Sequence, residues 1–129
     1  GGVTHDMEIG KSSEDYLEAM LMLEEELGYI RSVDIADKLG VTRPSVSYAT
    51  KRLRKHGYIT MDDSGLITLN APGQEIAERI YERHRVLADF IMELGVDEAI
   101  AYEDACHMEH DISDETFAAI KQKMEELKV

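Results

Sequence analysis

The sequence predicts a mainly α-helical protein that contains one short β-hairpin. Apolar residues recur at helical spacing through most of the 129 residues, and caps, glycines and prolines separate these stretches from one another. The exception is a pair of β-prone runs, residues 58–61 and 66–69, on either side of the turn-forming residues 62–65. Three helices before this hairpin and three after it indicate two small helical units.

The composition is that of a globular protein from a reducing compartment. The hydrophobic fraction is 43%, and no apolar run approaches the roughly 18–20 residues that span a bilayer. The single cysteine excludes an intramolecular disulfide and fits the cytoplasm. Residues 1–11 begin with a glycine pair and have no signal-peptide character, so we expect a disordered or tag-derived arm there.

The N-terminal unit is predicted to occupy residues 12–71. Its helices are expected at residues 12–27, at 32–39 with Ser32 as the N-cap, and at 42–55 with Thr42 as the N-cap. Residues 72–129 are predicted to form a long helix, a short helix over 97–110 and a last helix capped by Ser113. Three helices are too few to bury a secure core of their own, so we expect this second unit to form a homodimer.

The second and third helices have the pattern of a helix-turn-helix. Ala36 allows close helix approach, Gly40 suits the left-handed turn and Val46 is an apolar anchor, at offsets of four and six residues. The hairpin that follows makes this a winged helix-turn-helix, a DNA-binding arrangement.

The charge distribution supports DNA binding even though the whole chain has a net charge of −13. Residues 38–61 contain six lysines and arginines and no acid, which focuses positive potential on one surface; a solvated basic helix face is the alternative. The N-terminal part of the third helix is expected to enter the major groove. The candidate DNA-contacting residues are Thr42, Arg43, Pro44, Ser45, Ser47, Tyr48, Lys51, Arg52 and Arg54.

Cys106, Glu109 and His110 form a candidate metal-binding cluster. On a helix, their offsets of three and four residues bring them onto one face, with Cβ atoms roughly 5–6 Å apart. Thiolate, carboxylate and imidazole are all competent ligands of transition metals. The alternative is a buried thiol beside a surface acid and base.

Three further side chains are candidate ligands. Asp15 and Glu18 lie three residues apart on the first helix, although Ser12 and Asp15 also fit a capping box at a helix start. His84 lies on the apolar stripe of the long helix, where a packed core histidine is the alternative.

The order of these features resembles the diphtheria toxin repressor and manganese transport regulator family of metal-activated bacterial repressors. The likeness extends from about residue 12 to the end and is carried by residues 13–18 (Ser-Glu-Asp-Tyr-Leu-Glu), 83–85 (Arg-His-Arg) and 104–115. It implies a short two-domain form that lacks the SH3-like third domain of longer members. By this resemblance the metal ligands are Asp15, Glu18, His84, Cys106, Glu109 and His110.

The resemblance leaves two metals open. Asp15 is similar to the manganese-type members, whereas Cys106 is similar to the iron-type members. Ala88 and Tyr102 depart from the second site of the iron type, and Asp89 is displaced by about 100° around the helix. We expect Fe²⁺ or Mn²⁺ as the effector, with Co²⁺, Ni²⁺ or Zn²⁺ able to substitute in vitro.

The resulting hypothesis is a cytoplasmic, metal-activated transcriptional repressor of iron or manganese homeostasis genes. It is expected to bind a palindromic double-stranded operator as a homodimer and not to be an enzyme. A metal-independent winged-helix regulator, with Cys106 as a redox or ligand sensor, is the alternative. A zinc hydrolase using Glu109 is disfavoured because the sequence has no His-Glu-x-x-His motif.

Overall fold

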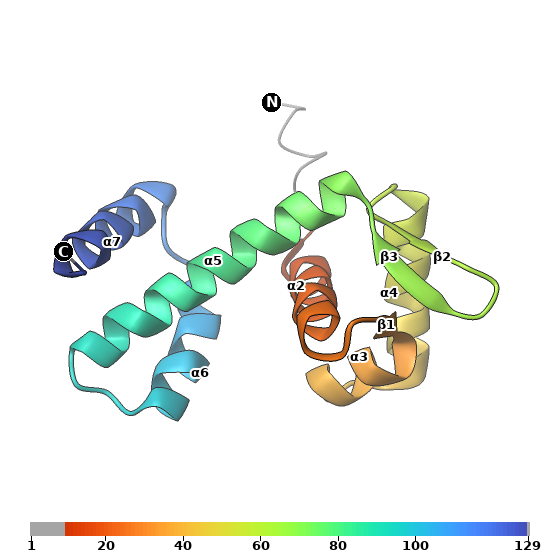
Figure 1. The fold of residues 1–129 in the computed structure, drawn as a ribbon, viewed down its shortest axis with the longest axis horizontal. Helices are drawn as coiled ribbons and strands as arrows, with labels where there is room; N and C mark the ends of the chain where they lie inside the picture. Colours follow the sequence, from red (N-terminus) through yellow and green to blue (C-terminus); the bar gives the residue numbers. More distant parts are fainter. Residues whose placement is uncertain (1–9, 129) are drawn as a thin grey trace. The chain divides into compact units, whose positions relative to one another are not determined.

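The computed structural model describes residues 10–128, which divide between Glu78 and Arg79 into two compact units. Most of the arm predicted for residues 1–11 lies outside the described residues, whereas residues 10 and 11 belong to the first helix. The elements are α2 (Gly10–Leu27), β1 (Ile30–Arg31), α3 (Ser32–Leu39), α4 (Arg43–Lys55), β2 (Ile59–Met61), β3 (Leu66–Leu69), α5 (Ala71–Glu93), α6 (Glu98–Met108) and α7 (Asp114–Leu127) (Figure 1).

The first unit is a winged helix-turn-helix, as predicted. Helices α2, α3 and α4 precede an antiparallel sheet with the strand order β1-β3-β2. Ile35, Val46 and Ile59 are almost fully buried and join α3, α4 and the hairpin in one core. The β2–β3 register pairs Ile59 with Leu69 and Met61 with Ile67.

The turn between α3 and α4 has the predicted local chemistry. Gly40 has a φ of 66°, the left-handed conformation that favours glycine. The Thr42 hydroxyl accepts a hydrogen bond from the Ser45 N–H at 3.2 Å, and Pro44 lies in the first turn of α4. The start of α4 is therefore fixed by residues that are adjacent in sequence.

The prediction of Ser32 as the N-cap of α3 is wrong. Arg31 has the N-cap position, with no side-chain capping bond, and Ser32 is the first helical residue. The reason is that Arg31 is extended and pairs with Leu66 in the sheet. Strand β1, two residues long, was not predicted from the sequence.

The tip of the hairpin is organised by one carboxylate. Asp62 accepts hydrogen bonds from the backbone N–H groups of Ser64 and Leu66, both at 2.9 Å, and from the Ser64 hydroxyl at 2.8 Å. Arg31 Nη1 donates to the Ser64 carbonyl at 3.0 Å. The bonds from Leu66 and Ser64 lower the pKa of Asp62 below its ordinary value of 3.8. The wing is thus ordered by its own side chains.

Helix α5 begins in close contact with the segment between α4 and β2. Asn70 N–H donates to the Tyr58 carbonyl at 2.9 Å, and its side-chain amide donates to the Gly57 carbonyl at 3.1 Å. A Cβ atom on Gly73 would lie 2.2 Å from the Tyr58 carbonyl oxygen, so only glycine fits there. These contacts hold the first turn of α5 against the residues that precede β2.

The second unit contains the later part of α5 together with α6 and α7 (Figure 1). Its core includes Leu87 and Ala88 from α5, Ala101 and Ala105 from α6, and Phe117 from α7. The predicted cap of α7 is confirmed: the Ser113 hydroxyl accepts from the Thr116 N–H at 3.1 Å. Helix α6 ends at Met108, two residues before the end that the sequence predicted.

Across residues 10–128, we find no helix with the length and apolar character needed to cross a membrane.

Substitution of Asp62 by alanine is expected to loosen the wing tip. Because the folded-state pKa is lowered, the carboxylate stabilises the tip above its ordinary pKa of 3.8, and this stabilisation is lost as the pH falls through the folded-state value. Amide hydrogen exchange at neutral pH should therefore be faster at Ser64 and Leu66 in Asp62→Ala. The neighbouring exposed Asp63→Ala variant is the control, and equal exchange in both variants would contradict this role.

Candidate metal centre and nucleic-acid interface

Glu109 and His110 lie on a turn between α6 and α7. Residues 109–112, here called the ligand turn, follow the last residue of α6. The Glu109 N–H still donates to the Ala105 carbonyl at 3.0 Å, and the Asp111 and Ile112 N–H groups both donate to the Met108 carbonyl. Glu109 and His110 are therefore presented by a compact turn rather than by one face of a continuous helix.

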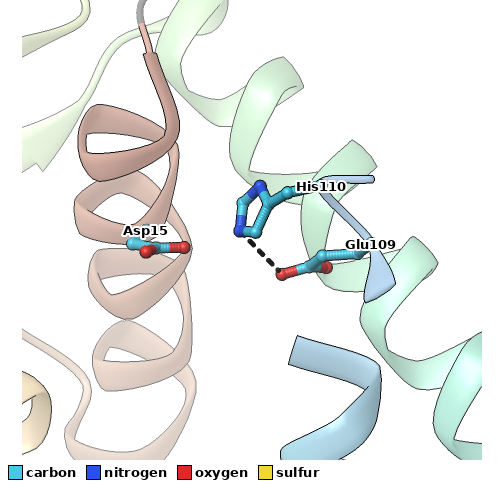
Figure 2. A group of neighbouring side chains, drawn as sticks. All are labelled: Asp15, Glu109 and His110. Atoms are coloured by element: carbon cyan, nitrogen blue, oxygen red, sulfur yellow. Dashed lines mark ion pairs between the residues drawn. The ribbon is translucent and has the colours of Figure 1, made fainter. Parts of the chain in front are cut away.

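The side chains of Glu109 and His110 have a geometry that suits a shared ion. Figure 2 shows the two groups pointing toward one another, with the carboxylate Oε1 of Glu109 3.6 Å from Nε2 of His110. Two donors that are each about 2.1 Å from one ion lie roughly 3.0–3.5 Å apart. Both side chains are nearly buried, with exposed fractions of 0% and 6%. An ion here would thus be largely shielded from water.

His84 supplies a third donor from α5. A ring nitrogen of His84 lies within 4.8 Å of a carboxylate oxygen of Glu109. Its Nε2 lies 2.9 Å from the Tyr102 carbonyl oxygen, which can only accept, so Nε2 carries the hydrogen and the neutral ring has its lone pair on Nδ1. A histidine that ligates a metal commonly donates its other N–H to a backbone carbonyl in this way. The arrangement favours ligation by His84 over a purely structural role.

Asp15 and Glu18 belong to the first unit and lie on α2. Asp15 is half-buried and Glu18 is buried, and their spacing of three residues places them on one side of the helix (Figure 2 draws Asp15). The described part of α2 begins at Gly10, and no acid lies in its first turn. The capping-box interpretation of Asp15 is therefore wrong, because that residue lies within the helix.

Cys106, its neighbour His107 and Asp89 of α5 have different surroundings. Cys106 is half-buried on α6 and, within residues 10–128, belongs to no set of three or more ligand-type side chains whose donor atoms lie within 4.8 Å of one another. The helical geometry expected for Cys106, Glu109 and His110 does not hold through His110, because α6 ends at Met108. His107 is exposed, and Asp89 lines a depression beside Met124 of α7.

The donors gathered in the second unit fit a divalent first-row metal. One carboxylate and two imidazoles, from Glu109, His84 and His110, form a mixed oxygen and nitrogen set. Carboxylate suits Mn²⁺, while imidazole suits iron and the later metals of the row.

The candidate DNA-binding residues gather on α4 and the turn before it. All nine predicted side chains, from Thr42 to Arg54, are exposed. The guanidinium of Arg52 lies 5.8 Å from the centre of the Tyr48 ring, within the range of a cation–π contact. The basic residues of the acid-free segment that belong to α4 are thus exposed on the surface of that helix.

An open depression of about 900 Å³ lies between α4 and β2, and sequence reasoning did not predict it. Its basic residues are Lys51, Arg54 and Lys55. Lys55 was not among the predicted contacts, although its place in the acid-free segment is a signal for it. The complete lining is Ser32, Ser47, Thr50, Lys51, Arg54, Lys55, Ile59, Thr60 and Met61.

Two protein-family profiles together match nearly the whole chain. The N-terminal DNA binding domain of the iron dependent repressors matches residues 8–65, and the iron dependent repressor metal binding and dimerisation domain matches residues 70–129. The boundary between the two matches lies where the hairpin meets α5.

Individual relatives agree with these profiles. The transcriptional regulator MntR of Escherichia coli O6:H1 is 40% identical over 108 residues, which are 84% of this chain and 70% of the relative. An uncharacterized HTH-type transcriptional regulator of Methanocaldococcus jannaschii is 35% identical over 93% of this chain and 98% of its own length.

Solved structures show the same fold. The structure of the manganese regulator SloR superposes with a TM-score of 0.76 at 29% identity, over 88% of this chain. The match covers 53% of the SloR chain, so the present chain spans about half the length of that structure. The resemblance inferred from the residues is confirmed, and the chain belongs to the iron-dependent repressor family, with a DNA-binding domain followed by a metal-binding and dimerisation domain.

Proposed function

We propose that the protein is a cytoplasmic repressor that binds operator DNA when it is loaded with Fe²⁺ or Mn²⁺, and that it controls genes of iron or manganese homeostasis. The observation that carries this proposal is that Glu109 has a ligand atom of His84 within 4.8 Å and Nε2 of His110 at 3.6 Å, in the metal-binding domain of a chain that also has a basic recognition helix. The Tyr102 carbonyl supports it further, because it fixes the ring of His84 in the form that a metal needs.

The full ligand set takes donors from both units. His84, Cys106, Glu109 and His110 come from the second unit, and Asp15 and Glu18 come from α2 of the first. The family resemblance supports this assignment. Asp15 and Glu18 of the first unit and the four ligands of the second would hold the ion together, and bonds from one ion to both units would restrict their relative orientation. The protein's own contribution is to orient the ring of His84 through the Tyr102 carbonyl and to hold Glu109 and His110 next to one another.

Restricted orientation is what a dimeric DNA-binding protein requires. Two recognition helices reach successive major grooves only when they are separated by about one turn of the double helix, roughly 34–36 Å. A homodimer with this geometry favours a palindromic operator, because its two-fold symmetry is matched by the DNA. A coupling of about 1–3 kcal/mol between metal and DNA binding changes operator affinity 5–150-fold.

The contact with DNA is assigned to α4 and the basic depression beside it. Arg43, near the start of α4, suits a guanine edge or a phosphate, and Ser45 and Ser47 suit phosphates. Lys51, Arg54 and Lys55 line the depression between α4 and β2, where a phosphate backbone would be attracted to three cations.

Removal of a single ligand is expected to abolish the response to metal. Operators selected from random duplexes by the Mn²⁺-loaded protein would be titrated at one salt concentration with Mn²⁺, Fe²⁺ without oxygen, Co²⁺, Zn²⁺ or a chelator. The wild type should bind 5–150-fold more tightly with its effector than with chelator. Glu109→Gln and His110→Ala should lose this difference, because each removes a donor of the nearly buried pair.

His107→Ala is the matched control, since His107 is exposed and next to the same turn. It should keep the full metal response. A wild type that binds DNA equally with metal and chelator, but responds to oxidant, would instead support the metal-independent regulator with Cys106 as its sensor.

The role of Cys106 can be tested by spectroscopy. If the thiolate is a ligand, the Co²⁺-loaded protein should show a sulfur-to-metal charge-transfer band in the near ultraviolet. Cys106→Ser should remove this band while the weaker visible bands of Co²⁺ remain, because the other donors are oxygen and nitrogen. A spectrum that is identical in the two proteins would exclude Cys106 from the ligand set.

The basic depression predicts a change in salt dependence. Lys55→Ala should weaken binding to all duplex sequences and reduce the slope of log affinity against log salt by about 1, the value for one lost phosphate contact. Lys123→Ala, an exposed lysine of α7, is the control and should leave the slope unchanged. An unchanged slope in Lys55→Ala would place Lys55 outside the DNA interface.

A further inference from the structure

Arg83 is a buried cation that lies next to a candidate metal ligand. It precedes His84 on α5, and only 7% of its surface is exposed. A charge in such surroundings is costly unless it is paired and hydrogen-bonded, so its contacts indicate what holds it there. The contacts below are all within the second unit.

The guanidinium of Arg83 contacts both ends of the ligand turn. Its Nη2 donates to the carbonyl of Glu109 at 3.0 Å and to the carbonyl of Ile112 at 3.3 Å. Its Nη1 donates to the carboxylate of Asp114 at 3.0 Å, and its central carbon lies 4.7 Å from the centre of the Phe117 ring. One side chain thus connects α5 to the turn and to the start of α7.

The two carbonyl contacts add hydrogen bonds on the acceptor side of the turn. The last carbonyl groups of a helix have no partner within it, and arginine side chains can supply one. In the ligand turn, N–H groups are bound by carbonyls of α6, while the carbonyls of Glu109 and Ile112 are bound by Arg83. The backbone that carries Glu109 and His110 is therefore held by its donors on one side and by its acceptors on the other.

The ion pair with Asp114 is the weaker part of this arrangement. The Asp114 side chain is 93% exposed, so water and salt screen its attraction to Arg83. The bonds to the Glu109 and Ile112 carbonyls involve a charged donor, the first of them in buried surroundings, where hydrogen bonds are strong. Asp114 thus offers a matched control, because its removal spares the two carbonyl contacts.

We infer that Arg83 is a positioning residue for metal binding: its guanidinium fixes the ligand turn so that Glu109 and His110 hold their ligand geometry before the ion arrives. This inference rests on the proposed ligand roles of Glu109 and His110. It also gives two neighbouring residues of α5 a part in the site: His84 is a proposed ligand, and Arg83 holds the turn that carries Glu109 and His110. Groups that support ligands from outside the coordination sphere typically change metal affinity 10–100-fold when they are mutated.

The test compares full-length Arg83→Met, Arg83→Lys, Asp114→Asn and Glu109→Gln with the wild type. Mn²⁺ affinity is measured from the electron paramagnetic resonance signal of the free ion, at a temperature where circular dichroism shows each metal-free variant folded. Amide hydrogen exchange at Asp111 and Ile112 is measured in the metal-free proteins. We expect Arg83→Met to weaken Mn²⁺ binding 10–100-fold and to accelerate exchange, whereas Asp114→Asn leaves both near the wild-type values.

Arg83→Lys keeps the charge but lacks the planar fork that reaches two carbonyls, so it should also weaken Mn²⁺ binding, and it replaces Arg83→Met if that variant does not fold. Wild-type Mn²⁺ affinity in a folded Arg83 variant would overturn the inference. The inference would also be overturned if the loss of Mn²⁺ affinity in the Arg83 variants were fully accounted for by the fraction of each variant that is unfolded. If Glu109→Gln keeps wild-type affinity, the proposed ligand set fails, and the metal-free exchange measurement still decides whether Arg83 holds the turn.

Discussion

The geometry of the candidate metal centre depends on how the ligand turn is held. Glu109 and His110 follow the end of α6, so the repeating hydrogen bonds of a helix do not fix both of them. Their backbone is instead bound by α6 carbonyls through its N–H groups and by Arg83 through two carbonyls. A donor atom displaced by a fraction of an ångström binds an ion poorly. The positions of Glu109 and His110 therefore depend on α5, which carries Arg83.

In the DNA-binding unit, the contacts that cap α4 and bind the Asp62 carboxylate at the wing tip are local. Thr42 caps α4 with a residue three positions away, and Asp62 orders the wing by accepting from Ser64 and Leu66. Such contacts form whether or not a metal is present. Under the proposed function, a metal would therefore change the placement of the recognition helix and wing in the dimer rather than their folding.

This difference explains what could be predicted from the sequence. The helix-turn-helix, the hairpin and the caps of α4 and α7 follow from neighbouring residues and were predicted. Strand β1 and the cap of α3 were not, because Arg31 is extended through its pairing with Leu66, a contact that no local pattern encodes. The end of α6 was misplaced for a similar reason: the spacing of Cys106, Glu109 and His110 fits a helix, whereas the turn is held by Arg83 from a distant segment. In the sequence, Arg83 stands next to the candidate ligand His84, but no local pattern indicates the partners of Arg83.

The charge of the protein bears on how a metal would activate it. A divalent ion adds two charges to a chain whose net charge is −13. Neutralisation of the nearby carboxylates would be equal for all divalent ions bound there, because their charges are equal. Restriction of the ligands depends instead on coordination number and bond length, which differ between Mg²⁺, Mn²⁺ and Zn²⁺. Under the proposed function, selectivity among metals in DNA binding, beyond selectivity in their occupancy, would be a property of geometry, and the ligand turn held by Arg83 would convert coordination geometry into a constraint on the backbone.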